Sequence, residues 1–93
     1  MNGRTEDPLY RRSEQALSAE VGDDVVALHI AKGHCYGMEK VAAEVWNMLE
    51  QPASLEQLCA GLVDRYEVQP ERCRSEVTDL LRQFEQEGLV ERA

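Results

Sequence analysis

The sequence has no long hydrophobic run, few aromatic residues and an odd number of cysteines. Its longest apolar stretches span only a few residues, far short of the roughly 20 that cross a membrane. The polar N-terminus also lacks the apolar core of a secretion signal. The three cysteines are irregularly spaced, which argues against a disulfide framework and for a reducing compartment. We therefore expect a cytoplasmic protein without a membrane partner.

Positive charge is scarce as well. The 93 residues carry 18 acidic and 10 basic side chains, which gives a formal net charge of −8. Nucleic-acid binding draws much of its affinity from basic side chains that neutralise phosphates, so this balance disfavours a nucleic-acid partner. A chain of this length forms one small domain with little room for a deep active site. A protein or peptide partner is the better expectation.

Catalytic motifs are also missing. The six glycines are scattered and form no phosphate-binding loop, and no pair of carboxylates stands out from the acidic surface. Cys59, Cys73 and Trp46 fall in the apolar stripes of predicted helices, where a core position is the simpler interpretation. We expect no enzymatic activity and no cofactor.

Hydrophobic periodicity divides the chain into three strands followed by three helices. Alternation over residues 15–21, an apolar run over 25–30 and the segment 34–38 predict the strands. The i, i+4, i+7 spacing after Met38 predicts a helix over about 39–50.

Two local signals place the remaining helices. A capping box formed by Ser54 and Gln57 predicts a helix over 54–66, and Pro70 in the N1 position opens one over 70–87. The expected fold is α+β and winged helix-turn-helix-like, with a three-stranded antiparallel sheet followed by three helices. We expect Leu89 and Val90 to return to the core. Residues 1–13 are expected to be a flexible tail before a domain of residues 14–93.

Both histidines and one cysteine crowd into the segment 28-LHIAKGHCYGM-38. A two-residue turn at Lys32-Gly33 predicts the cross-strand pairs Ala31–His34, Ile30–Cys35, His29–Tyr36 and Leu28–Gly37. Because paired residues share a face, Cys35 is predicted to point into the core while His34 and Tyr36 point the other way. A zinc site needs three or four ligands, and a cysteine–histidine pair needs both on one side. We therefore predict neither a metal site nor a nucleophile here.

A fold of this kind without catalytic groups is compatible with two binding functions. A winged-helix DNA reader would insert the helix over 70–87 into the major groove, but that helix carries five acids against three arginines. Alternatively, the edge of strand 34–38 can pair with an extended peptide. Leu81 widens the apolar arc of the last helix, which suggests a cleft walled by Leu81, Val77 and Arg74. Packing of Leu81 against the first helix is the competing interpretation.

Four runs of sequence together resemble the PqqD family of peptide-recognition proteins over about residues 14–91. They are 25-VVALHIAKGHCYGM-38, 45-VWNML-49, 55-LEQLCAGLVDRYEV-68 and 84-FEQEGLV-90. Cys35 departs from the family pattern, which often has an aromatic there, and Glu39 stands where the helix start usually has Asn.

The resemblance implies a RiPP recognition element, which binds the leader of a ribosomally synthesised precursor peptide as an added strand and presents it to modifying enzymes. The implied peptide-binding residues are Leu28, His34, Cys35, Tyr36, Gly37, Met38, Arg74, Val77, Thr78 and Leu81. The hairpin most resembles stand-alone subunits of lasso-peptide clusters, whose implied partners are a cysteine-protease subunit and an ATP-dependent cyclase. A radical-SAM enzyme is the implied partner in the other pathway type. A winged-helix transcription regulator and a scaffold joining two enzymes remain alternatives.

Overall fold

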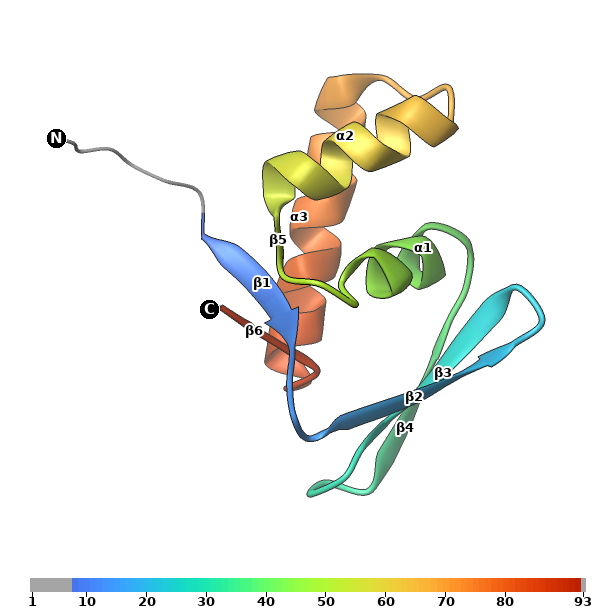
Figure 1. Cartoon of the computed structure of the whole chain (residues 1–93), viewed down its shortest axis with the longest axis vertical. Coiled ribbons are helices and arrows are strands. Elements are labelled where there is room, and N and C mark those ends of the chain that lie inside the picture. The colour runs from blue at the N-terminus through green and yellow to red at the C-terminus, as the bar shows by residue number, and fades with distance from the viewer. Residues whose placement is uncertain (1–7, 93) are drawn as a thin grey trace, which may run out of the picture.

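A computed structural model of the chain describes residues 8–92. The elements follow in the order β1 (Leu9–Arg12), β2 (Ala16–Val21), β3 (Asp24–His29), β4 (His34–Met38), α1 (Lys40–Met48), β5 (Ala53–Ser54), α2 (Leu55–Arg65), α3 (Pro70–Gln86) and β6 (Val90–Arg92). The predicted α+β fold is confirmed, because β2–β4 form a three-stranded antiparallel sheet that is followed by three helices (Figure 1). None of the helices described is both long and apolar enough to cross a membrane.

The main sheet has the strand order β2-β3-β4, so β4 lies at an edge. The predicted two-residue turn between β3 and β4 is wrong, because His29 pairs with His34 and residues 30–33 form the connection. The Ile30 N–H donates to the Gln15 carbonyl, and the Gly33 N–H closes the turn on the His29 carbonyl. Gly33 has a φ of 70°, a conformation that glycine adopts without steric cost.

The side chains that share each face of the sheet are the predicted ones. The β3–β4 pairing is shifted by two residues from the predicted pairing, and a shift by an even number leaves every side chain on its predicted face. Val25, Ala27 and Met38 share the covered face and are buried. Cys35 lies on the opposite, outer face and is exposed, so its predicted inward orientation is wrong. Alternation determines which side chains share a face, but the helices determine which face becomes the core.

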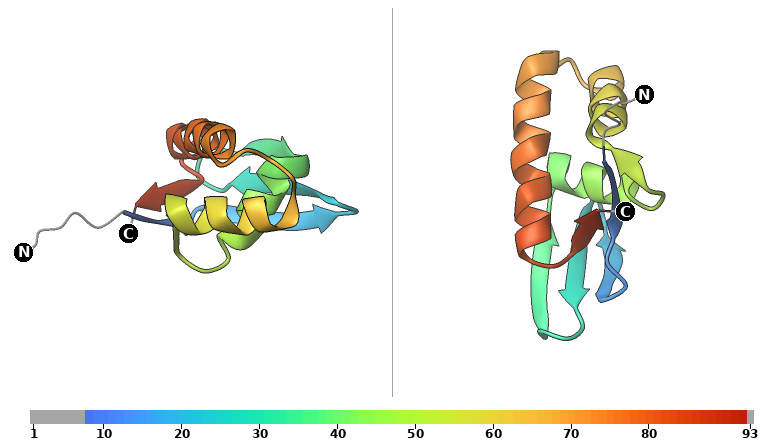
Figure 2. Two further views of the ribbon diagram at one scale, coloured as in Figure 1. Left: turned by 90° about the horizontal axis from the view of Figure 1, so that it is seen from above. Right: turned by 90° about the vertical axis from the view of Figure 1, so that its left-hand side faces the viewer.

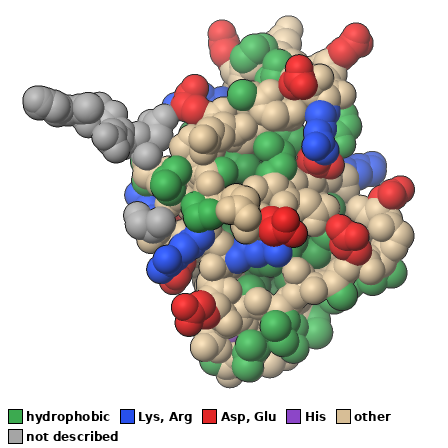
Figure 3. All heavy atoms as spheres, in the orientation of Figure 1, with side chains coloured by type: hydrophobic (Ala, Val, Ile, Leu, Met, Phe, Trp, Pro, Cys, Tyr) green, Lys and Arg blue, Asp and Glu red, His purple; other side chains and the backbone are tan. Residues whose placement is uncertain are grey.

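The outer face of the main sheet is unusually apolar. Leu17 and Val21 on β2 lie on the same face as Val26 on β3, and each of these side chains is exposed. Figure 3 shows hydrophobic side chains at the surface over the sheet end of the molecule.

The helices begin where the local signals placed them. The Ser54 hydroxyl accepts from the Gln57 N–H while the Gln57 side chain accepts from the Ser54 N–H, which confirms the capping box. Pro70 occupies the first turn of α3 as predicted. The start of α1 is different: Glu39 makes no side-chain cap, and Lys40 turns the chain away from β4 with a φ of 52°.

A second small sheet joins the two ends of the chain and was not predicted. Its strand order is β5-β1-β6, and all pairs are antiparallel. The expected flexible tail is therefore wrong for residues 9–12, which form β1; residues 1–7 lie outside the described part. Arg12 anchors this strand, because its guanidinium donates to the Trp46 carbonyl at 2.6 Å and stacks on the indole at 4.6 Å. Arg12 and Trp46 are distant in sequence, so no local pattern predicts their contact.

The helices lie on one side of the main sheet, and α2 packs beside α3 (Figure 2). Trp46 on α1 and Phe84 on α3 meet edge to face with ring centroids 5.7 Å apart. Leu89 and Val90 are buried, which confirms their predicted return to the core. This packing brings α3 alongside β4 and creates the site described next.

Candidate functional site

The edge of β4 is the feature that can accept another chain. β3 pairs with β4 on one side over residues 34–38, and no described strand pairs with its other side. An edge strand presents backbone N–H and C=O groups that an extended segment can pair with. The edge is short, five residues, which limits nonspecific pairing.

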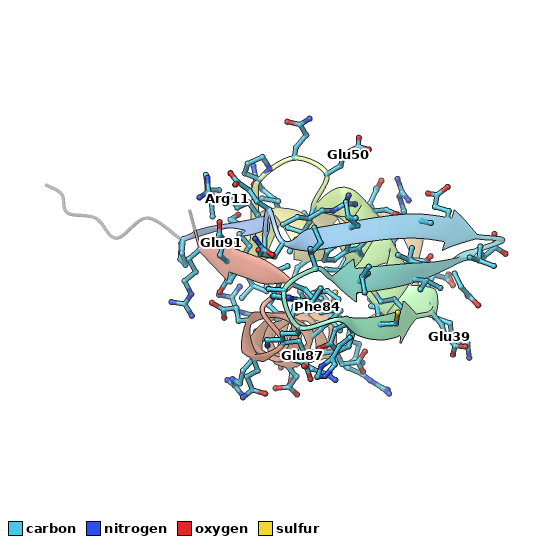
Figure 4. All side chains as sticks on the ribbon, turned by 90° about the horizontal axis from the view of Figure 1, so that it is seen from below. Arg11, Glu39, Glu50, Phe84, Glu87 and Glu91 are labelled. Carbon is cyan, nitrogen blue, oxygen red and sulfur yellow. The ribbon has the colours of Figure 1, made fainter. Side chains whose placement is uncertain are left out.

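A cleft of about 320 Å³ lies between β4 and α3. β4 contributes Cys35, Tyr36, Gly37 and Met38, and α3 with its C-cap contributes Leu80, Gln83, Phe84 and Glu87. Figure 4 shows Phe84 and Glu87 beside β4, with Glu39 at the far end of that strand. A segment added to the β4 edge would therefore have a partly apolar wall along one side.

One end of the cleft is closed by polar contacts between β4 and the end of α3. The Tyr36 hydroxyl donates to Glu87 Oε1 at 2.8 Å, and His34 Nδ1 lies 3.3 Å from the same hydroxyl. Lys32 Nζ donates to the Glu87 carbonyl at 3.1 Å, which adds a contact from the β3–β4 connection. The hydrogen bond to Glu87, together with burial and the negative charge, raises the pKa of Tyr36. The phenol therefore stays protonated and keeps donating.

His29 supports this end of the cleft from within. It is buried, and its Nδ1 accepts from the Lys32 N–H at 3.2 Å. A Cβ added to Gly88, whose φ is 77°, would lie 2.9 Å from His29 Nε2. Glycine at this position therefore lets the chain pass close to the imidazole as it leaves α3. The sequence patterns singled out neither His29 nor Gly88 as part of the site, because their contact joins segments that are far apart in the chain.

The residues expected on α3 do not wall the cleft as a group. Leu81 is 2% exposed and belongs to the core, as does Val77. Arg74 forms an ion pair with Glu56 on α2, and Thr78 donates back to the Arg74 carbonyl. The cleft wall is formed instead by the neighbouring stripe of α3 that carries Leu80 and Phe84.

The rotation of α3 explains this difference. One residue along a helix turns a side chain by about 100°, so Leu80 and Leu81 face different neighbours. The sequence marked both as apolar, and only the packing of α3 decided which one lies beside β4. Leu28 was also expected at the site, but it lies on the central strand β3, where it pairs with Cys35.

The cysteines have no reactive arrangement among the described residues. Cys35 and its neighbour His34 point to opposite faces of the sheet, as predicted. Burial, followed by the proximity of Cys73, raises the pKa of the Cys59 thiol to about 11. A thiol protonated at neutral pH is a poor nucleophile. Within residues 8–92 no group of three or more His, Cys, Asp or Glu side chains could hold a metal ion.

Comparisons with known proteins found matches to a family model and to solved structures. The family model described as coenzyme PQQ synthesis protein D (PqqD) matches residues 24–90, more than half of the chain. No curated protein matches the sequence.

Two solved structures are similar over most of their length. The first, described as TbiB1 in complex with the TbiA(beta) leader peptide, is 27% identical with a TM-score of 0.84. The match covers 87% of this chain and 94% of that one. The second, described as lasso peptide synthetase B1 complexed with the leader peptide, is 18% identical with a TM-score of 0.77. That match covers 88% of this chain and 96% of the other, and at this identity it supports the fold alone.

Proposed function

This chain belongs to the PqqD family, and from that premise we propose that it is a RiPP recognition element that binds the leader of a ribosomally synthesised precursor peptide. The leader adds as a strand to the open edge of β4 and lies against α3. The observation that carries this proposal is the unpaired β4 edge beside a partly apolar cleft. The first similar structure, at 27% identity, contains a leader peptide and so supports the assignment.

Strand addition suits the physical properties of this site. Main-chain hydrogen bonds supply affinity for almost any extended sequence, while side-chain pockets supply selectivity. The edge offers five residues for pairing, and the cleft between Tyr36 and Phe84 offers space for side chains on one face of the added strand.

The bound leader is presented to modifying enzymes, and the chain itself contributes no chemistry. One of the two similar structures is described as a lasso peptide synthetase B1 complexed with the leader peptide. Together with the resemblance of the hairpin to stand-alone subunits of lasso-peptide clusters, this favours a cysteine-protease subunit and an ATP-dependent cyclase as partners over a radical-SAM enzyme. The exposed apolar outer face of the sheet supports a protein partner, because contiguous exposed apolar surface commonly marks interaction sites. We place the protein in the cytoplasm, in keeping with its three free cysteines.

A winged-helix DNA-binding regulator is the weaker alternative. In such a protein α3 would approach the phosphate backbone. Three arginines of α3 already pair with carboxylates, Arg72 with Glu76, Arg74 with Glu56 and Arg82 with Asp79. The net charge of −8 adds repulsion from phosphate.

Titration with the precursor peptide encoded beside the gene tests the proposal. A fluorescently labelled leader should bind saturably, while a scrambled leader of identical composition should not. Because pairing to a strand edge depends little on phosphate-like charge contacts, the affinity should change only modestly between low and high salt. Absence of binding by a protein with a native circular-dichroism spectrum would rule out this function. A mobility shift of DNA that weakens steeply with salt would favour the regulator instead.

A further inference from the structure

A second cavity continues the cleft along the same side of α3. It has a volume of about 450 Å³ and lies between the first turn of α1, the α2–α3 connection and the N-terminal half of α3. Val77 lines it from α3, and Val41 lines it from α1. Pockets of roughly 300–1,000 Å³ accommodate small ligands, so this one has room for a large side chain.

Exposed apolar residues gather at this cavity. Val41, Tyr66 and Val68 are 37%, 44% and 40% exposed, and each of them lines it. Val41 comes from α1, whereas Tyr66 and Val68 come from the α2–α3 connection, so the fold brings together two segments that are distant in sequence. A single exposed apolar side chain needs no explanation, but a group around a concavity indicates a binding surface.

The backbone of β4 leads toward this cavity. The Tyr36–Glu87 contact marks one end of the cleft, and Ala42 and Leu80 line it further along. After Met38 the chain leaves the strand direction, because Lys40 has a φ of 52°. A peptide strand paired with β4 need not make this turn, so an extension of it beyond Met38 would run toward Val41, which lines the second cavity.

The distance between the two cavities sets a spacing in the peptide. The α3 residues that line the first run from Leu80 to Glu87, and those that line the second run from Arg72 to Val77. The midpoints of these two stretches are about nine residues apart, or about 13 Å at a rise of 1.5 Å per residue. An extended strand covers that distance in roughly four residues. An even spacing keeps both side chains on the same face of the strand.

We propose that the second cavity binds an apolar or aromatic side chain of the leader, four residues from another apolar side chain that occupies the β4–α3 cleft. This inference rests on the proposed function and adds the pattern that the peptide must carry. An acidic anchor is disfavoured, because the rim carries Glu67 and Glu76, and Arg72 is already paired with Glu76.

Variants of both partners test the pattern. Val41→Lys and Tyr66→Ser alter exposed side chains and should preserve the fold, which circular dichroism and thermal melting would check. Each should weaken binding of the leader encoded beside the gene by roughly tenfold to a hundredfold, the effect of losing one buried apolar side chain. Leu9→Lys is the matched control, because Leu9 is 42% exposed on β1, in the other sheet, and lines neither cavity. The affinity of this variant for the leader should stay at the wild-type value.

Alanine substitutions along the leader then locate the two anchors. In double-mutant cycles, the binding energies of Val41→Lys and Tyr66→Ser should be coupled to the substitution of one leader residue. The binding energy of Leu80→Asp should be coupled to the substitution of a second leader residue, four positions away from the first. Wild-type affinity in both pocket variants, or coupling to residues at another spacing, would overturn this inference while leaving leader binding in place. Failure of the wild-type protein to bind any leader would overturn the proposed function and this inference with it.

Discussion

The hydroxyl of Tyr36 on β4 donates a 2.8 Å hydrogen bond to Glu87 at the C-cap of α3. These residues are 51 positions apart in sequence, and their contact holds the edge strand beside the helix. The distance between β4 and α3 sets the width of the cleft between them. The Tyr36–Glu87 pair therefore links the stability of the fold to the geometry of the proposed binding site.

Tyr36→Phe should make stability less sensitive to alkaline pH. The pKa of Tyr36 is raised above its ordinary value of 10.0 by the hydrogen bond to Glu87. The folded state therefore prefers the protonated phenol more than the unfolded state does. Its stabilising contribution is complete below about pH 10 and disappears as the pH rises through the folded-state pKa. Urea denaturation midpoints of wild type and variant across this range measure the difference.

Tyr66→Phe is the control for that measurement, because Tyr66 lies at the end of α2 and makes no contact with Glu87. Tyr66→Phe should lose stability at alkaline pH to the same extent as the wild type. An identical alkaline profile for Tyr36→Phe and wild type would contradict the role assigned to the Tyr36–Glu87 hydrogen bond.

Adjacent leucines of α3 should respond differently to the same substitution. Leu80→Asp places a carboxylate in the cleft and should weaken leader binding by roughly tenfold or more while the protein stays folded. Leu81→Asp buries a charge in the core and should destabilise the protein by more than about 3 kcal/mol. Thermal melting and peptide titration separate the two effects. Unfolding of the Leu80 variant together with tolerance of the Leu81 variant would contradict the orientation of α3.

Leader binding should protect the amides of β4 from hydrogen exchange. The added strand pairs with the free edge, so amides within residues 34–38 that face outward should exchange more slowly in the complex. The strand β2 forms the opposite edge of the same sheet and serves as an internal control. Its amides within residues 16–21 should exchange at the free-protein rate, whereas protection of β2 instead of β4 would place the peptide at the wrong edge for this proposal.

The three cysteines should differ in their reactivity toward iodoacetamide. Cys35 is exposed on the outer face of the sheet, while Cys73 is buried. The pKa of Cys59 is raised to about 11 by burial and by Cys73, which keeps its thiolate population small at mildly alkaline pH. Mass spectrometry of a time course should show Cys35 alkylated first. Equally rapid alkylation of Cys59 would be inconsistent with its environment.

Ser54→Ala should lower the free energy of unfolding by about 1 kcal/mol, the usual effect of losing an N-cap side chain. The Ser54 hydroxyl accepts from the Gln57 N–H, which would otherwise lack an intrahelical partner. Ser75→Ala, at an exposed position within α3, is the control and should change stability by less than about 0.5 kcal/mol. Equal effects of the two substitutions in urea denaturation would argue against a stabilising cap.

Local patterns in the sequence were sufficient for the strands of the main sheet and for all three helices. Alternation, the Ser54 capping box and Pro70 each act over a few neighbouring residues. They can therefore be recognised in the sequence without knowledge of tertiary contacts. Alternation likewise separated Cys35 from His34, a result that does not depend on the exact turn, because the observed register differs from the predicted one by an even number of residues.

Only the tertiary structure decided which side of each element is covered. Cys35 is exposed because the helices pack on the other face of the sheet, and Leu80 rather than Leu81 lines the cleft because of how α3 is rotated against β4. The β5-β1-β6 sheet pairs segments from both ends of the chain. Each of these outcomes depends on contacts between residues far apart in sequence. The sequence by itself determined the strands of the main sheet, the three helices and the alternation of side chains along the strands, because these depend on neighbouring residues. Packing determined the second sheet, the core and the wall of the cleft.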